Sequence, residues 1–198
     1  GLAAGCGYMY EIKRQGKGTT RKLDPVSRQI SSVPIIASVV SDENMPDSYA
    51  WNDGLWMIKR KKEAGKKKPV TVYEVSLTDW LKEKSADELV DFVKQEGYTH
   101  VCFLPVAEYL NEEMNGYSTL GYFAVTHRIG GSDAFKKLVD DCHNAGIGVI
   151  IDWNGAYFGT EAKGLYDFDG ADAYGYLKPS LEKHPEWDVV TFDYKKGA

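Results

Sequence analysis

The chain has 198 residues, 43% of them hydrophobic, and a formal net charge of −5 at pH 7. The hydrophobic fraction is sufficient for a packed core and argues against global disorder. The acidic balance argues against nucleic acid as the main partner, and no stretch approaches the roughly 18 apolar residues that span a membrane. The length suits one domain or two small ones. We expect neither nucleic acid nor a membrane as a partner.

The cysteines and histidines indicate no metal site. Cys6, Cys102 and Cys142 are an odd number without close spacing, which predicts neither a disulfide framework nor a zinc site. Cys102 and Cys142 lie in apolar contexts typical of buried thiols, which suit a reducing compartment. We expect a cytoplasmic location, no metal and no cofactor. His143 is expected to be structural. The chain does not begin with Met and opens without a secretory signal, so we expect a piece of a longer protein.

The first sixty residues carry β-strand patterns. Residues 8–13 alternate in polarity, residues 15–18 form a glycine-containing turn, and residues 19–23 return the chain, which predicts a hairpin. Residues 33–40 are a second β-prone stretch, followed by a polar, turn-rich segment. We therefore expect a small β-rich segment at the start of the chain.

A lysine-rich stretch follows this segment. Residues 59–62 and 66–68 are basic and flank Gly65. Two interpretations are open: a patch that binds an anionic ligand, or a solvated linker between domains, which such charge runs usually are. We expect a basic linker over residues 61–69.

Strands and helices alternate in the next part of the chain. Residues 70–75 predict a strand. Ser85 and Glu88 then have the spacing of a capping box, in which each residue bonds the backbone of the other at a helix start. The spacing predicts a helix that begins at Ser85 and ends at Gly97.

Two further strands and one helix complete this alternation. Residues 100–105 predict a strand, and residues 147–153 predict a third that is almost entirely apolar. Between them, Ser132 is expected to cap a helix that Gly146 ends. Its apolar residues recur at helical spacing: Phe135, Leu138, Val139 and Cys142. Apolar strands alternating with amphipathic helices are typical of a parallel sheet covered by helices.

Candidate site residues lie where the predicted strands end, because ligands of parallel α/β folds bind at that edge. Asp152 is either an active-site carboxylate or an anchor for the next loop. Glu108 is either a general acid or base or an ordinary surface carboxylate. The aromatic residues near this edge are either sugar-stacking platforms or loop packing: Tyr117, Tyr122, Trp153 and Tyr157.

Short motifs follow one another along the chain in a fixed order: residues 72–77 with Trp80, 97–101, 104–108, 116–117, 121–124, 142–153, 164–165, 168–170, 184–187 and 192–194. Each motif is weak alone, but the ordered set resembles the bacterial α-1,4-glucan branching enzymes of the amylase superfamily. Residues 22–25 and 49–51 look like the end of the family's β-sandwich and the strap that leads into its barrel. The resemblance covers almost the whole chain.

This resemblance implies an α/β fold, a partial (β/α)8 TIM barrel with its first three βα units and a long loop, preceded by a small β-rich segment. Residues 1–60 would be the end of an N-terminal glucan-binding-type β-sandwich and its strap. Residues 61–69 would be the basic linker, and residues 70–198 the N-terminal part of the catalytic barrel. An unfinished barrel leaves strand edges open, so we expect self-association.

The implied activity is retaining transglycosylation, which cleaves an α-1,4 link and makes an α-1,6 branch in a glycogen-like α-glucan. This chemistry needs a nucleophilic and an acid/base carboxyl group, which the family carries after its fourth and fifth strands. We therefore expect no catalytic residue in this chain and no activity of the chain alone. Tyr117 corresponds to the family's sugar-stacking tyrosine and Asp152 to the aspartate of its first signature motif. Trp153 and Tyr157 are the other expected substrate-binding residues.

Several positions depart from the family pattern. After the third strand, residues 154–157 read Asn-Gly-Ala-Tyr where the family has Val-Pro-(Gly/Ala)-His, so Tyr157 replaces a sugar-contacting histidine. Ser118 replaces a glutamine, Asn115 a tryptophan and Ser76 a histidine. Losing hydrogen bonds at a subsite weakens transition-state binding. Two hypotheses follow: a piece of a branching enzyme, or a degenerate, non-catalytic relative that binds α-glucan.

Overall fold

The computed structural model describes residues 1–14, 16, 18–32, 35–41, 49–170, 173–176 and 186–196. Predicted features at residues 33–34 and 42–48, and the first half of the motif at 184–187, lie outside this part of the chain. Two compact units are formed, each from separated stretches of sequence. Unit 1 comprises Gly1–Asn44, Ala107–His127 and Trp153–Ala198, and unit 2 comprises Met45–Val106 and Arg128–Asp152. The units cut across the segments 1–60, 61–69 and 70–198, which stay predictions about the domains of a longer protein.

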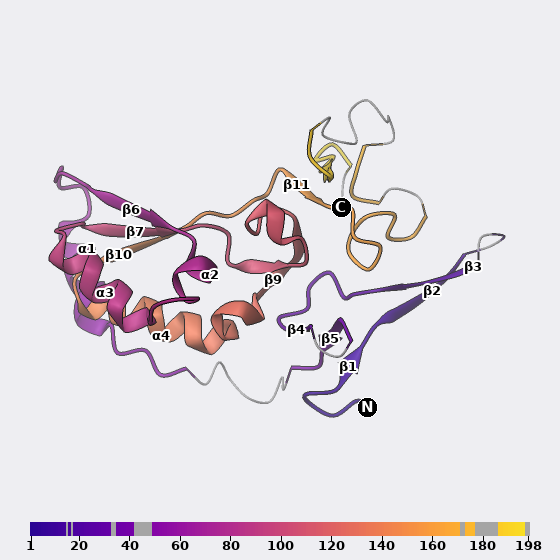
Figure 1. Cartoon of the computed structure of the whole chain (residues 1–198), viewed down its shortest axis with the longest axis horizontal. Coiled ribbons are helices and arrows are strands. Elements are labelled where there is room, and N and C mark those ends of the chain that lie inside the picture. Colours follow the sequence, from indigo (N-terminus) through magenta and orange to yellow (C-terminus); the bar gives the residue numbers. More distant parts are fainter. Residues whose placement is uncertain are drawn as a thin grey trace. The chain divides into compact units, whose positions relative to one another are not determined.

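Unit 2 is built on a parallel, three-stranded sheet. Strands β6 (Val72–Val75), β7 (His100–Phe103) and β10 (Gly148–Ile151) lie in the order β6–β7–β10, and each pairs in parallel with its neighbour. The register aligns the last residues of all three strands, so their carboxyl ends meet at one edge. Figure 1 shows the three strands side by side. The predicted parallel arrangement is confirmed.

Strand β10 differs from the prediction of a buried strand. Within the described residues it pairs with β7 alone. Ile151 is 46% exposed and Ile150 is 40% exposed, although both were expected to be covered. The reason is that one side of β10 has no neighbouring strand in this part of the chain, so its outer side chains stay accessible.

Helices α2 (Leu77–Trp80), α3 (Ala86–Gln95) and α4 (Gly131–Asn144) accompany this sheet, and α4 contacts both α3 and β10. Helix α3 begins as predicted. The Ser85 hydroxyl accepts a hydrogen bond from the Glu88 amide at 3.2 Å, and the Glu88 carboxylate accepts one from the Ser85 amide at 2.7 Å. This capping box satisfies two amides that have no partner inside the helix.

The start of α4 was predicted incorrectly. The residue before the helix is Gly130, with a φ of 87°, and Ser132 lies inside the first turn. Glycine adopts this left-handed conformation at little cost. A Cβ at Gly130 would also lie only 2.8 Å from the Cβ of Ala134, so the tight turn needs glycine. The apolar face of α4 is as predicted: Phe135, Leu138 and Cys142 are buried.

Helix α1 (Gly54–Glu63) was not predicted and extends into the residues expected to form the linker. It is held at its start through α4. His143 Nδ1 lies 2.7 Å from Asp53 Oδ2, and the His143 ring stacks on Trp56 at 5.0 Å. The structural role expected for His143 is confirmed.

Unit 1 contains short antiparallel pairs and long loops. Its N-terminal strands are β1 (Gly7–Tyr8), β2 (Tyr10–Arg14), β3 (Gly18–Lys22), β4 (Ile30–Ser31) and β5 (Ala37–Val39). The pair β2–β3 is the predicted hairpin, and β1, β5 and β4 form a separate antiparallel sheet. A small apolar core joins this region to a later strand: Leu23, Ile30, Leu120 and Ala124.

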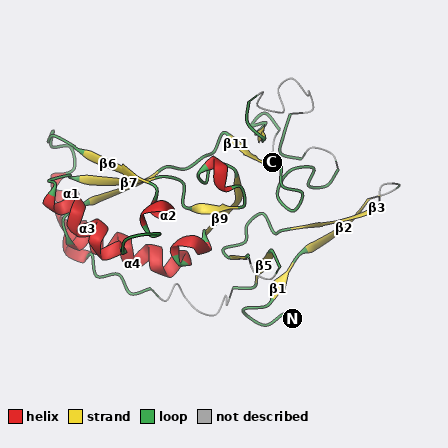
Figure 2. Ribbon diagram, in the orientation of Figure 1, coloured by secondary structure: helices red, strands yellow, loops and turns green. Residues whose placement is uncertain are grey.

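The remaining elements of unit 1 follow the second and third strands of unit 2 in sequence. Strand β8 (Ala107–Tyr109) pairs with β9 (Thr119–Val125) through an irregular register, and β11 (Tyr157–Gly159) pairs with β12 (Val189–Thr191). The short 3-10 helix η1 (Glu112–Met114) precedes β9. The 3-10 helix η2 (His127–Ile129) follows β9 and, apart from His127, belongs to unit 2. Helices α1 to α4 lie within the residues of unit 2, whereas the described part of unit 1 is mostly strand and loop. Figure 2 colours the helices red and the strands yellow.

Helices long and apolar enough to cross a membrane do not occur among the described residues.

Candidate functional site

Three of the four predicted site residues belong to unit 1. Tyr117 lies in the loop between η1 and β9, Trp153 follows β10 in sequence, and Tyr157 begins β11. Asp152, the last residue of unit 2, follows the end of β10. The site is therefore built here from the loops of unit 1, and Asp152 is described within its own unit.

Asn154 connects the loops that carry the two tyrosines. Its amide nitrogen donates to the carbonyl oxygen of Tyr117 at 2.8 Å and to that of Tyr157 at 3.1 Å. Its side-chain oxygen accepts from the Ala156 amide at 3.1 Å. Asn154 is only 9% exposed, so these bonds replace water that burial has removed. The sequence reasoning noted the asparagine as a departure but did not predict this role.

Tyr122 supports the same loop from strand β9. Its hydroxyl donates to the Tyr157 carbonyl oxygen at 2.6 Å, so this oxygen accepts from both Tyr122 and Asn154. Burial raises the pKa of the Tyr122 phenol, which keeps the group protonated and able to donate. The Tyr122 ring also meets Trp153 edge to face, with centroids 5.9 Å apart.

Aromatic rings cover one part of unit 1, and we call Trp153, Tyr157, Trp187 and Tyr194 the aromatic surface. Trp153 is 62% exposed and Tyr194 is 73% exposed. Tyr157 and Trp187 lie in ring contact, with centroids 5.6 Å apart. Exposed aromatic faces of this kind are suited to stacking on flat, partly apolar ligands.

Gly155 allows the Trp153 ring to lie close to the backbone. A Cβ at Gly155 would lie 2.4 Å from that ring, so a larger residue at position 155 would force the Trp153 ring to move. The Gly155 carbonyl oxygen also accepts a hydrogen bond from the Tyr194 hydroxyl. One glycine therefore brings two members of the aromatic surface to the same short loop.

A buried carboxyl group lies next to Tyr117. Ser118 is almost fully buried, and its hydroxyl donates to Glu161 Oε1 at 3.1 Å. Glu161 Oε2 is also buried and has no hydrogen-bond partner within the described residues. Burial raises the pKa of the Glu161 carboxyl group. A Cβ at Gly159 would lie 1.8 Å from Glu161 Oε2, so a larger residue at position 159 would displace the carboxyl group from this position.

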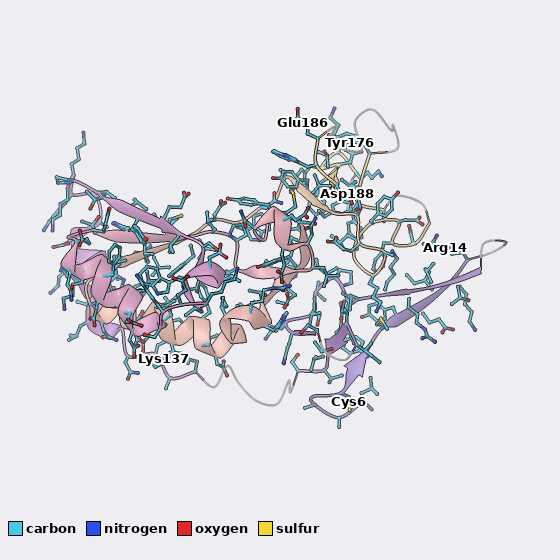
Figure 3. The ribbon with its side chains drawn as sticks, viewed as in Figure 1. Cys6, Arg14, Lys137, Tyr176, Glu186 and Asp188 are labelled. Atoms are coloured by element: carbon cyan, nitrogen blue, oxygen red, sulfur yellow. The ribbon has the colours of Figure 1, made fainter. Side chains whose placement is uncertain are left out.

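The N-terminal hairpin holds the loop that follows Glu161. The Lys22 ammonium group, on a residue that is 2% exposed, donates to the carbonyl oxygens of Ala162 at 2.6 Å and Tyr166 at 2.5 Å. Burial lowers the pKa of this ammonium group. Arg14, labelled in Figure 3, donates to the Asp167 carboxylate at 2.9 Å. Strands β2 and β3 thus fix the backbone beside the candidate site.

The backbone of Asp152 continues the sheet of unit 2. Its amide donates to the Phe103 carbonyl oxygen at 2.8 Å, which continues the β7–β10 pairing by one residue. Cys102 lies nearby, and its pKa is raised by burial first and then by the charges of Glu74 and Asp152. The two interpretations of Asp152, active-site carboxylate and loop anchor, both stay open as predictions.

Glu108 is a buried anchor, so its interpretation as a surface carboxylate was wrong. It is 2% exposed and accepts hydrogen bonds from the Thr126 hydroxyl at 3.1 Å and the His127 amide at 3.0 Å. The His127 ring lies 3.0 Å from the same carboxylate. These bonds join the start of β8 to the end of β9. Among the described residues, no group of three or more His, Cys, Asp or Glu is placed to hold a metal ion.

Comparison with known sequences finds close relatives over nearly the full chain. A 1,4-α-glucan branching enzyme from Methylococcus capsulatus is 38% identical over 206 residues, covering 99% of this chain and 27% of that protein. Another from Kitasatospora aureofaciens is 39% identical and covers 98% of this chain and 25% of that protein. The chain spans about a quarter of the length of these curated relatives. No family model matches the chain.

A solved structure supports the fold. The crystal structure of a protein provisionally named an α-amylase, from Salmonella typhimurium, superposes with a TM-score of 0.68 over 91% of this chain and 29% of that one. Its sequence identity of 24% supports a shared fold and nothing finer. The resemblance predicted from the ordered motifs is confirmed: over nearly its whole length, the chain is a sequence relative of the bacterial 1,4-α-glucan branching enzymes.

Proposed function

We propose that the chain is the part of an α-1,4-glucan branching enzyme that holds the substrate glucan. The observation that carries this proposal is the match to branching enzymes over 98–99% of the chain. The aromatic surface supports it independently, because aromatic rings stack on the apolar faces of sugars. Tyr117, whose loop Asn154 ties to that of Tyr157, is the residue that the family resemblance assigns to sugar stacking.

The proposed reaction is transglycosylation with retention, which forms α-1,6 branches in a glycogen-like glucan. It requires two carboxyl groups about 5–5.5 Å apart, one as nucleophile and one as acid/base. We place this pair outside these 198 residues, in keeping with relatives that are several times longer. The chain itself would contribute sugar-binding surface and scaffold.

The parallel order β6–β7–β10 supports the proposal that these strands are part of a larger barrel. In a (β/α)8 barrel, each βα unit adds its strand beside the previous one, and these three strands follow that order. We propose that they are the first three strands of a barrel.

We also propose that the open side of β10 can pair with another copy of the chain. Self-association would be excluded if the wild-type chain sedimented as a monomer at high concentration and if Ile151→Lys had the same sedimentation coefficient.

A second candidate function is glucan binding without catalysis. It is favoured by the roles of the residues that depart from the family pattern. The Ser118 hydroxyl and the Asn154 amide are engaged in bonds within unit 1. Groups bonded in this way are not available to a substrate at the same time. We therefore propose a non-catalytic glucan-binding relative as the alternative.

One comparison separates the two functions. Two samples would be incubated with amylose: the protein encoded by the complete reading frame, and the 198-residue chain alone. New α-1,6 linkages would be counted by proton NMR. Binding would be measured by retardation in gels that contain amylopectin. Branching by the longer protein supports the enzyme; retardation without branching supports the binding relative. If the longer protein showed no branching and no retardation, both functions would be refuted.

A further inference from the structure

Asn154 lies where two loop segments of unit 1 meet, the loop that carries Tyr117 and its own loop before Tyr157. Its amide nitrogen donates to the carbonyl oxygens of Tyr117 and Tyr157, which lie in different loops. Its oxygen receives the Ala156 amide. A neutral carboxamide offers two donor hydrogens and an acceptor oxygen, so both faces of this side chain are used.

The chemistry of this junction requires an amide. Both partners on the nitrogen side are carbonyl oxygens, which accept hydrogen bonds only, and the partner on the oxygen side is an N–H group. An aspartate would face the two carbonyl oxygens without a donor when ionised, and an apolar residue would remove all three bonds that Asn154 makes. Because the residue is 9% exposed, water has little access to replace the lost bonds.

The bonds of Asn154 also help to position two residues of the aromatic surface, Tyr157 and Trp153. The Tyr157 carbonyl oxygen is fixed by Asn154 on one side and by Tyr122 on the other, and the Tyr122 ring contacts Trp153. Any shift of the Asn154 amide therefore moves the backbone of Tyr157 relative to Trp153. Rigid placement of rings by buried bonds lowers the entropy lost when a ligand is bound.

We propose that Asn154 is a positioning residue for α-glucan: its carboxamide sets the spacing of Tyr117 and Tyr157 and so determines how tightly a glucan chain is held. This inference deepens the proposed function and rests on it. Asn154 touches the backbone of both tyrosines and acts through them, without contacting the sugar itself.

The test uses two variants of Asn154 and one control. Asn154→Leu keeps the size and removes all three bonds, whereas Asn154→Asp keeps the acceptor and removes the donors. Asn144→Leu is the matched control, because the Asn144 amide also donates to a backbone carbonyl, that of Asp140 in helix α4. Affinity for maltoheptaose would be measured by calorimetry, and backbone opening by hydrogen exchange of peptides covering residues 113–120 and 153–159.

At neutral pH, both Asn154 variants should bind maltoheptaose about tenfold more weakly, the effect of losing roughly one or two net hydrogen bonds. They should exchange faster at both peptides, while Asn144→Leu does neither. Lowering the pH protonates the carboxyl group in Asn154→Asp and restores one donor. The affinity of this variant relative to wild type should then recover, and that of Asn154→Leu should not. A variant that merely filled space would not show this pH-dependent difference.

The outcomes distinguish this inference from the function beneath it. If wild type binds maltoheptaose and the Asn154 variants bind equally well, the positioning role is refuted and the glucan function stands. If wild type does not bind, the glucan function is refuted, and the positioning role for glucan falls with it. In that case faster exchange at both peptides would still identify Asn154 as the loop junction.

Discussion

The two units of the chain are stabilised by different kinds of contact. Unit 2 relies on apolar packing at regular spacing: Phe103 of β7 is fully buried and meets Phe135 of α4. Unit 1 combines a small apolar core with single polar side chains that bond the backbone of distant loops, as Lys22 and Asn154 do. A periodic core tolerates many apolar sequences, whereas a polar junction depends on one residue type. Substitutions in the two units should therefore have different consequences, and five predictions test this contrast.

The largest effect is expected in the core of unit 2. Phe103→Ala should lower the free energy of unfolding by about 3–5 kcal/mol, because a fully buried ring is replaced by a cavity. Urea denaturation followed by circular dichroism measures this change. A loss below 1 kcal/mol would mean that the sheet and α4 do not pack as described.

The hairpin junction should give the next largest effect. Lys22→Met should lower the free energy of unfolding by about 2–3 kcal/mol, because two carbonyl oxygens lose a charged donor. Arg21→Met on the same strand is the control, since Arg21 is exposed and 3.8 Å from Glu11; it should change stability by less than about 0.5 kcal/mol. Equal effects of the two substitutions would contradict the junction.

The aromatic surface should affect binding without affecting stability. Trp153→Ala removes a largely exposed ring, so stability should change little, but affinity for maltoheptaose should fall about tenfold. Calorimetry and thermal unfolding of the same sample separate the two quantities. Unchanged affinity would remove Trp153 from the proposed glucan surface.

The two serines near helix starts provide a matched pair within unit 2. Ser85→Ala should cost about 1 kcal/mol because it removes the capping box of α3. Ser132→Ala should change the free energy of unfolding by less than about 0.5 kcal/mol, because Gly130 occupies the position before α4. Equal losses would show that Ser132 has a capping role after all.

The smallest effect is the pH dependence of Glu161. Burial raises its pKa in the fold, so the folded chain binds this proton more tightly than the unfolded chain does. The stability that protonation contributes is complete below the usual carboxyl pKa and is lost as pH rises through the raised value. Glu161→Gln should flatten this part of the profile of melting temperature against pH. A wild-type profile that rises across the same window would contradict the sign.

The sequence predicted those parts of the fold that depend on interactions between residues close together in the chain. The capping box of Ser85 and Glu88, the β2–β3 hairpin and the apolar face of α4 each depend on residues a few positions apart. The start of α4 was predicted incorrectly because a glycine turn competes with a serine cap, and only the backbone angle of Gly130 distinguishes them.

The substrate-binding role of the candidate residues stays a prediction, and the hydrogen bonds that connect their loops were not predicted. Tyr117, Trp153 and Tyr157 were expected near one another from strand ends and family motifs, and they lie in one unit. The bonds of Asn154 and Lys22 were missed because their partners are far away in sequence; Lys22 and Ala162 are separated by 140 positions. A buried lysine or asparagine in a sequence does not indicate which carbonyl oxygens will face it.

The attachment of the β2–β3 hairpin to residues 162–167 has a consequence for protein engineering. Chimeras between relatives are usually made by exchanging whole N-terminal modules at a linker. Here, a foreign hairpin would need to present an ammonium group and a guanidinium group to the backbone and carboxylate of a segment inherited from the other parent. Swaps that transfer residues 10–23 together with residues 161–167 should therefore yield more soluble chimeras than swaps that transfer either segment alone.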